Sequence, residues 1–115
     1  MNSKPILLKR TFDDVYGLGN NPTVYAGKQY IGSGISPSAN NVYVNNCVFR
    51  YCSSSSAGGA IYCGSSVYKF LVEQSSFLSC RTAGNNGGAI YFYSSTSGEC
   101  VLSRTCGYNC SSTYT

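Results

Sequence analysis

The chain lacks histidine and tryptophan altogether, and charged residues make up only 10% of its 115 positions. An ordinary globular domain carries roughly 25% charged residues. Without histidine, a cysteine nucleophile has no customary general base to activate it. Low charge argues against intrinsic disorder, because disordered chains rely on charge to stay solvated. The net charge is +4, but after residue 10 the basic residues are scattered singly, which disfavours a nucleic-acid-binding face.

Long apolar runs are also absent. No stretch approaches the ~20 apolar residues that a membrane-spanning helix needs. The apolar run near the N-terminus, residues 5–8, is shorter than the ~7–15-residue core of a secretory signal. The location of the protein therefore stays open: the chain is cytosolic, is secreted by another route, or has lost its leader.

The sequence is rich in residues that favour strands and tight turns. It contains 11 tyrosines and 13 glycines, and serine recurs in runs such as Ser53 to Ser56. Tyr, Val, Ile and Phe favour strands, whereas Gly, Ser and Asn favour turns. This composition predicts an all-β chain with many turns.

An internal repeat is the strongest pattern in the sequence. Residues 42–63 align with residues 70–91, and a degraded third copy begins at Cys100. We use the word column for equivalent positions in successive copies. Four columns are predicted to form core stacks: Val44, Val72 and Leu102; Phe49 and Phe77; Ile61 and Ile90; and Cys52, Cys80 and Cys110. The paired glycines at the start of each GGAIY run are predicted to form corners, where positive φ or close backbone approach excludes a Cβ: Gly58, Gly59, Gly87 and Gly88.

The period within each copy predicts the secondary structure. Val42 and Val44, like Phe70 and Val72, alternate with the spacing of two that is typical of strands. No copy contains an amphipathic helical run of about ten residues, which excludes the helical repeat folds. A strand-and-turn repeat of this length suits one turn of a solenoid, with equivalent residues stacked at the ~4.8 Å strand spacing. We therefore predict an all-β, right-handed, single-stranded parallel β-helix of about two and a half coils; a small β-sandwich does not explain the columns.

The repeat also predicts how the chain is divided. Residues 1–41 are expected to form an N-terminal strand-and-turn segment and possible cap, with strands at Pro5–Phe12 and Thr23–Ile31 and a turn-rich connector at Gly32–Asn41. Residues 42–115 are expected to form the coils. The third copy stops after Cys110 without its GGAI run. Because an open end exposes unpaired strand edges, we expect a fragment of a longer protein, or a partner that covers that end.

The motif C-x-F-x-x-C, a Ser-rich loop and then GGAIY resembles the repeats of the polymorphic outer-membrane proteins of chlamydiae. It is also similar to cysteine-bearing repeats in large surface-protein families of trichomonad-like protists. The residues that carry the resemblance are Cys47, Phe49, Cys52 and Gly58–Tyr62 in the first copy, and Phe77, Cys80 and Gly87–Tyr91 in the second. Cys52 and Cys80 stand where the bacterial motif has asparagine. The resemblance implies a parallel β-helix associated with surface display and adhesion.

Seven cysteines allow three interpretations. A zinc site favours closely paired cysteines, and only Cys106 and Cys110 come near that spacing. Disulfides suit a secreted chain, although an odd count leaves one cysteine unpaired within a monomer. The column argument favours free, core-facing thiols that act as small hydrophobic side chains.

The four acidic residues show no pattern of paired carboxylates. Glycoside hydrolysis needs two carboxylates that face each other across a sugar. Asp13 and Asp14 are adjacent, so they point to opposite faces of a strand, and Glu73 and Glu99 do not share a column. We therefore predict no catalytic residue, no cofactor and no metal site, and we expect the acids to be solvated surface charges.

Together these patterns predict a non-catalytic structural or interaction repeat protein, as a fragment of a larger surface-displayed, adhesin-like β-helix. The candidate interaction stripe is Tyr62, Tyr91 and Tyr93, since aromatic residues are enriched at contact surfaces; packing of these tyrosines against the coil is equally compatible. Expected partners are proteins, further coils at the C-terminal end, or surface glycans, and not nucleic acid. Two alternatives stay open: an intracellular structural component of a larger assembly, and a fragment of a polysaccharide-processing enzyme. Location at the cell surface or outside the cell follows if the resemblance holds, and an intracellular location follows if the absent signal is genuine.

Overall fold

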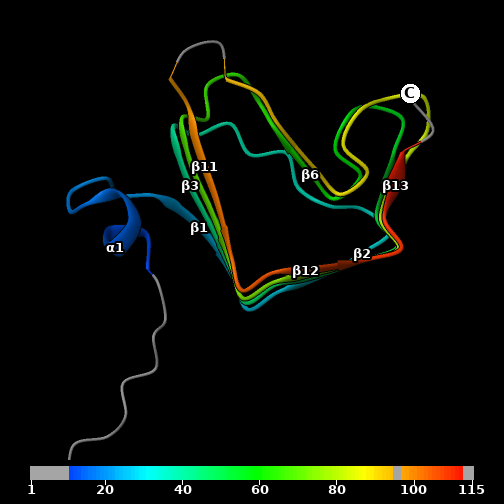
Figure 1. Cartoon of the computed structure of the whole chain (residues 1–115), viewed down its shortest axis with the longest axis horizontal. Helices are drawn as coiled ribbons and strands as arrows, with labels where there is room; N and C mark the ends of the chain where they lie inside the picture. Colours follow the sequence, from blue (N-terminus) through cyan, green and yellow to red (C-terminus); the bar gives the residue numbers. More distant parts are fainter. Residues whose placement is uncertain (1–10, 95–96, 113–115) are drawn as a thin grey trace, which may run out of the picture.

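The computed structural model describes residues 11–94 and 97–112 (Figure 1). This part of the chain contains one helix, α1 (Phe12–Tyr16), and thirteen short strands. The strands form four sheets, and every strand pair within them is parallel. The protein is therefore strand-rich with little helix.

The four sheets take their strands from different parts of each copy. Sheet A contains β1 (Thr23–Ala26), β3 (Asn41–Asn45), β7 (Lys69–Glu73) and β11 (Glu99–Ser103), in that order. Sheet B contains β2 (Gln29–Ile31), β4 (Val48–Arg50), β8 (Ser76–Leu78) and β12 (Cys106–Tyr108). Sheet C contains β6 (Ile61–Cys63) and β10 (Ile90–Phe92). Sheet D contains β5 (Ser53–Ser54), β9 (Arg81–Thr82) and β13 (Ser111–Ser112).

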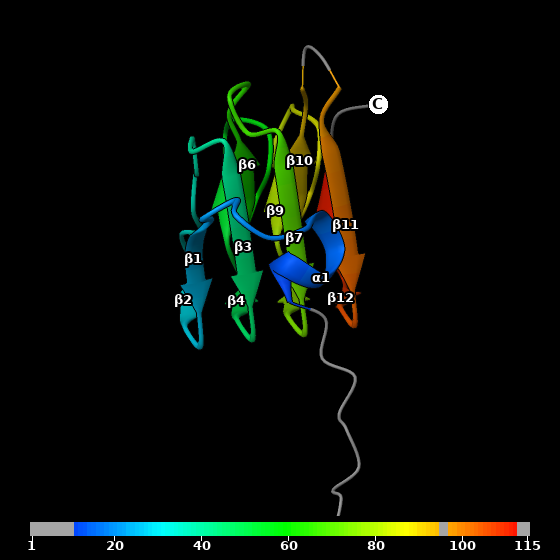
Figure 2. The same cartoon turned by 90° about the vertical axis from the view of Figure 1, so that its left-hand side faces the viewer.

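From β3 onward the chain visits the sheets in the order A, B, D and then C, whereas the first traverse, through β1 and β2, has no strand in sheet D. We call each such traverse a pass. Successive passes lie side by side, as the four strands of sheet A show in Figure 2. In this sheet Val44 pairs with Val72, and Val72 pairs with Leu102. The columns seen in the sequence are thus neighbouring positions in parallel ladders.

The prediction of a right-handed parallel β-helix of about two and a half coils is wrong in the form in which we made it. The strands fall into four separate small sheets, and the described residues form no closed solenoid. The column pattern carries information on which residues pair, because a period of two and a constant step specify register. The pattern carries no information on whether the strands close into a solenoid, because closure depends on the serine- and glycine-rich connections between the sheets.

Sharp two-residue corners, each with one residue of positive φ, separate the strands of sheets A, B and D within one pass. Between sheets A and B the residues of positive φ are Asn46, Gln74 and Arg104, with φ of 55°, 49° and 51°. Between sheets B and D they are Tyr51, Ser79 and Asn109, with φ of 52°, 53° and 56°. A non-glycine residue in this left-handed region costs about 1–2 kcal/mol, so each corner is maintained by the ladders on either side.

The hydrophobic core lies between sheets A, B and C. Its centre is an aromatic column in sheet B, in which the rings of Tyr30, Phe49 and Phe77 stack on one another. The ring centroids are 4.9 Å apart for the first pair and 4.8 Å apart for the second, and both pairs are close to parallel. The other fully buried members of the core include Val42, Val44, Cys47, Cys52, Ile61, Cys63, Val67, Phe70, Val72 and Cys80.

Helix α1 lies across the outer face of sheet A (Figure 2). The Thr11 hydroxyl accepts a hydrogen bond from the Asp14 amide, and the Asp14 carboxylate accepts one from the Thr11 amide, which is a capping box. The Phe12 ring packs on Tyr43 with centroids 6.0 Å apart. The Tyr16 hydroxyl lies 2.8 Å from the Phe70 carbonyl oxygen and 3.0 Å from that of Glu99. These contacts tie the helix to β3, β7 and β11.

Two strand predictions in the N-terminal segment need correction. The predicted strand Pro5–Phe12 is wrong at Phe12, which begins α1 because Thr11 and Asp14 cap a helix there; residues 5–10 lie outside the described residues. The predicted strand Thr23–Ile31 is two strands, β1 and β2. Gly27 separates them with φ of 65°, a conformation that no strand contains.

Candidate binding groove

A groove of about 570 Å³ opens beside sheet C. Its walls are residues 33–36, which follow β2, together with Ser54 at the end of β5 and residues 56–60, which lead into β6. The side chains of Tyr62, Asn85 and Tyr91 complete the lining. Segments from three parts of the sequence therefore meet around one concave surface.

Close backbone packing of the glycines builds the floor of the groove. Gly58 has φ of 74° and Gly87 has φ of 71°, so both adopt the left-handed conformation that glycine tolerates best. A Cβ on Gly59 would strike the Gly88 carbonyl oxygen, and one on Gly34 would strike the backbone of Ala60. The Gly59 amide donates to the Gly87 carbonyl across a distance of 3.1 Å. Of the four glycines predicted as corners, Gly58 and Gly87 thus supply the positive φ, and Gly59 and Gly88 lie where the backbone of the next pass leaves no room for a Cβ.

The lining of the groove is polar but uncharged. It contains no Asp, Glu, Lys or Arg. Within the part of the chain that the structure describes, no hydrogen bond engages the hydroxyls of Ser33, Ser36 or the tyrosines of the groove. The Ser54 hydroxyl accepts a hydrogen bond of 2.9 Å from the Ser56 amide. The groove is therefore suited to an uncharged ligand that offers many hydrogen-bonding groups.

Two stacked tyrosine rings form one side of the groove. Tyr62 and Tyr91 pair in register in sheet C, with ring centroids 5.5 Å apart and ring planes 3° from parallel. Tyr62 is 38% exposed. Tyr93, the third member of the predicted stripe, is 58% exposed and does not line the groove. Tyr93 follows β10 by one residue, so it leaves the register that aligns the other two.

Serine takes the place of a third ring in this column. Ile35 forms a parallel bridge with Ile61, and the Tyr62 amide donates to the Ile35 carbonyl across 3.0 Å. This register places Ser36 beside Tyr62, on the side away from Tyr91. Residues 32–41 were expected to be a turn-rich connector, and they do not show the repeat clearly enough to reveal this register. The sequence signal that would have found Ser36 is the single Ile35, which occupies the column of Ile61 and Ile90.

The predicted core stacks occupy neighbouring positions, but the third copy leaves the core. Phe49 stacks on Phe77, and Ile61 pairs with Ile90. Leu102 was predicted as a core residue and is 53% exposed, and Cys110 is only half-buried. Both belong to the last described pass, which has no further strand to cover it among the described residues. The prediction of core positions is therefore wrong for Leu102.

All seven cysteines have free thiols in this structure. Four are buried: Cys47, Cys52, Cys63 and Cys80. The Cys80 thiol donates to the Phe49 carbonyl at 3.5 Å and the Cys110 thiol to the Phe77 carbonyl at 3.5 Å, so each bonds to the preceding pass. Burial raises the pKa of Cys63 and that of Cys80 to about 12. Among the described residues, no group of three or more His, Cys, Asp or Glu side chains is placed to hold a metal ion.

The free energy of unfolding is expected to fall as the pH rises from about 9 towards 12. The pKa of Cys63 and of Cys80 is about 12 in the folded protein, above the ordinary value of 9.0, so the unfolded chain releases these protons first. Their contribution to stability is complete below about pH 9 and is lost through this window. Urea unfolding at several pH values measures the loss. The double variant Cys63→Ala and Cys80→Ala should show a shallower decline between about pH 9 and 10, below the range in which Tyr16 titrates; an unchanged decline would contradict the assignment.

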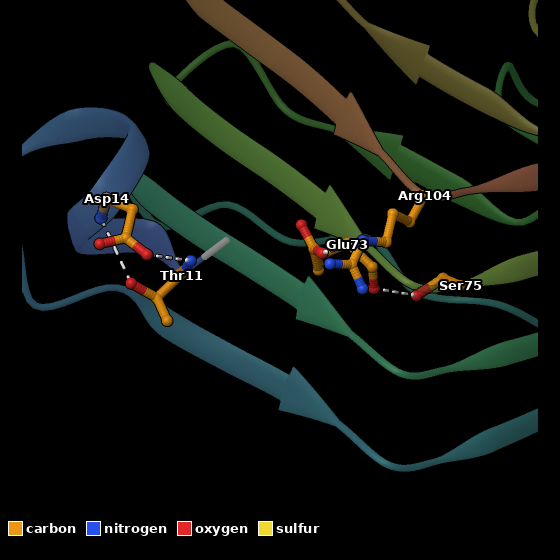
Figure 3. A network of polar contacts seen from close by, with 5 residues as sticks. All are labelled: Thr11, Asp14, Glu73, Ser75 and Arg104. Atoms are coloured by element: carbon orange, nitrogen blue, oxygen red, sulfur yellow. Dashed lines mark hydrogen bonds and ion pairs between the residues drawn. The ribbon is translucent and has the colours of Figure 1, made fainter. Parts of the chain in front are cut away.

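Glu73 departs from the expectation of a solvated surface charge. Its side chain is 0% exposed, and its Oε2 lies 3.8 Å from Nε of Arg104 (Figure 3). The Ser75 hydroxyl donates to the Glu73 backbone carbonyl at 3.0 Å. Neither Glu73 carboxylate oxygen has a hydrogen bond, and nor has the buried Oδ1 of its strand neighbour Asn45. Glu73 ends β7 at the level of Ser103, whereas Glu99 begins β11 at the level of Lys69, so these two acids are not paired across a site.

Searches of known protein families, of curated proteins and of solved structures find no match to this chain. In the described part of the chain, no helix is long and apolar enough to cross a membrane.

Proposed function

We propose that this protein is a non-catalytic binding domain whose ligand-contacting surface is the groove beside sheet C. The observation that carries the proposal is the combination of a concave, uncharged lining with two stacked and partly exposed tyrosines at its edge. Binding sites are typically concave, with aromatic walls and a few polar groups that fix orientation. Tyrosine suits such a surface because it offers apolar contact area and a hydroxyl with little loss of side-chain entropy.

The rigidity of the surroundings favours binding as well. The backbone of the floor is held by hydrogen bonds between passes, from the Gly58 amide to the Asn86 carbonyl at 3.0 Å and from the Ala60 amide to the Ala89 carbonyl at 2.8 Å. A preorganised surface loses less conformational entropy when a ligand binds. The resemblance of the repeats to surface-displayed adhesive proteins supports the same role, with the partner on another cell or in its surroundings.

The arrangement of the acids supports a role without catalysis. Asp13 and Asp14 lie on α1, Glu73 lies beneath Arg104, and Glu99 lies at the start of β11. None of them lines the groove. A ligand held there contacts hydroxyls, amides and aromatic rings, and the lining contains no carboxylate, histidine or lysine to act as a general acid or base.

We expect at least one uncharged ligand to perturb the groove in solution. The test is a titration of the ¹⁵N-labelled chain with cellohexaose, chitohexaose and an uncharged peptide that contains tyrosine and proline. Shifts of backbone amide signals confined to residues 33–36 and 56–62 are expected. The absence of shifts with every ligand, or shifts only elsewhere, would contradict the proposal. Mass spectrometry of the same samples should find the oligosaccharides intact, and cleaved products would contradict the non-catalytic role.

A further inference from the structure

We propose that the groove recognises an uncharged glycan, and that one of its pyranose rings stacks on the face of Tyr62 that is turned towards Ser36. This inference rests on the proposed function, because it names the ligand class of the same groove. Three features of the described residues carry it: the register of the tyrosine column, the chemistry of the lining and the absence of charge from it.

The first feature is a column in which one ring is replaced by a small side chain. The column reads Ser36, Tyr62 and Tyr91, with neighbouring positions in adjacent parallel strands. One face of Tyr62 is turned towards Tyr91, and their rings are 3° from parallel. No described aromatic ring stacks on the opposite face. Since adjacent strands lie ~4.8 Å apart, a flat ring bound at the level of Ser36 would continue the stack.

The second feature is the set of hydrogen-bonding residues in the lining of the groove. The hydroxyls of Ser33, Ser36 and Ser56 line the groove, together with the side chain of Asn85. A pyranose of the β-gluco type carries C–H groups on both faces and hydroxyls around its rim. Its faces therefore match the tyrosine ring, and its rim matches the serines and Asn85. A planar hydrocarbon ligand would match the tyrosine but would cover the serine hydroxyls without offering them a partner, which is costly.

The third feature is the absence of charged groups from the lining. A nucleotide carries phosphate and an acidic glycan carries carboxylate or sulfate, and recognition of such anions uses Arg, Lys or a helix N-terminus. The lining contains no basic side chain, and its walls are loops and strands. An anionic ligand would lose hydration without gaining a partner. The chemistry therefore favours a neutral glycan over a charged one of the same size.

Two substitutions at the stack test the inference by NMR titration with cellohexaose and chitohexaose. Tyr62→Ala removes the ring, and Ser36→Tyr fills the level at which the sugar is expected to stack. Each is expected to weaken oligosaccharide binding about tenfold or more. Ser36→Tyr adds a cross-strand aromatic pair, so it should unfold at the same temperature as the unsubstituted chain or higher. The matched control is Tyr93→Ala, which removes an exposed tyrosine outside the groove and should leave binding unchanged.

Each outcome has a defined meaning. A groove perturbed by a neutral oligosaccharide, with binding lost in both stack variants and kept in the control, supports the inference. Binding that persists in Ser36→Tyr, or that is equally strong for an oligogalacturonate of the same length, overturns it. If the peptide alone perturbs the groove, the glycan inference fails and the proposed binding function stands. If no ligand perturbs the groove, both fail.

Discussion

Replacing Gly59 by alanine is expected to lower the free energy of unfolding by about 3 kcal/mol, the upper part of the range for overpacking a closed site. A Cβ at this position would strike the Gly88 carbonyl oxygen and would lie 2.6 Å from that of Arg81. Both atoms belong to the backbone of the next pass, so no side chain can rotate away to make room. The passes must then separate where the Gly59 amide donates to the Gly87 carbonyl, which weakens that hydrogen bond as well. Urea unfolding followed by circular dichroism measures the change.

Gly64→Ala is the matched control for this prediction. The atoms nearest to a Cβ on Gly64 are the Pro37 carbonyl oxygen at 3.7 Å and the Ser38 Cβ at 3.9 Å, which is ordinary van der Waals contact. The same substitution should therefore cost little there, or stabilise the protein by about 0.4–1 kcal/mol by restricting the unfolded chain. Equal effects of the two substitutions would show that the loss at Gly59 does not come from close approach of the passes.

The sequence predicted pairing better than it predicted shape. Hydrophobic residues at a spacing of two, repeated at a nearly constant step, specify which residues become strand neighbours, and Val44 and Val72 are such a pair. Nothing in that pattern specifies how far each corner turns. The corners are formed by residues as different as Gln74 and Tyr51, both with positive φ, so residue type does not reveal them. The number and separation of the sheets therefore could not be predicted.

Helix α1 and the burial of Glu73 could not be predicted for other reasons. The segment from Thr11 to Asp14 carries a capping-box signature, but its helix of 5 residues is too short to show a helical period. Glu73 occupies the outer face of sheet A, where its strand pattern predicts exposure to solvent. Its burial arises from tertiary contacts that include Arg104, which lies 31 positions later in the sequence. Such contacts have no local signature.

The sequence identified only part of the lining of the groove. The recurring GGAIY runs identified Tyr62 and Tyr91 and the glycines beside them, because these positions repeat. The neighbouring wall comes from residues 33–36, in which the repeat is reduced to Ile35. The groove lies between passes that show the repeat clearly and the first pass, which does not, so the clear repeats alone could not predict it. The irregular residue, Ser36, is also the one that leaves the face of Tyr62 open to a ligand.

Phe49→Ala is expected to cost about 4–5 kcal/mol, the largest loss of stability that we predict for a single substitution. Truncation of a buried phenylalanine typically costs about 3–5 kcal/mol, because it removes apolar burial and leaves a cavity. Phe49 is fully buried, and it lies in the middle of its column, with Tyr30 on one face and Phe77 on the other. Each stacked pair adds about 0.5–1.5 kcal/mol beyond burial, which places this residue at the upper end of the range. The free energy of unfolding in urea is the measurement.

Two further variants separate stacking from burial. Phe49→Leu keeps most of the apolar volume but removes both ring stacks, so it should cost roughly 1–3 kcal/mol, between the unsubstituted chain and Phe49→Ala. Tyr108→Ala removes an aromatic side chain from the same sheet at a position that is 72% exposed, and it should change stability by no more than about 0.5 kcal/mol. A loss at Phe49→Ala as small as that at Tyr108→Ala would mean that the aromatic column does not hold the passes together. The register of the strands would then depend on the backbone ladders and on the close packing of the glycines at the groove.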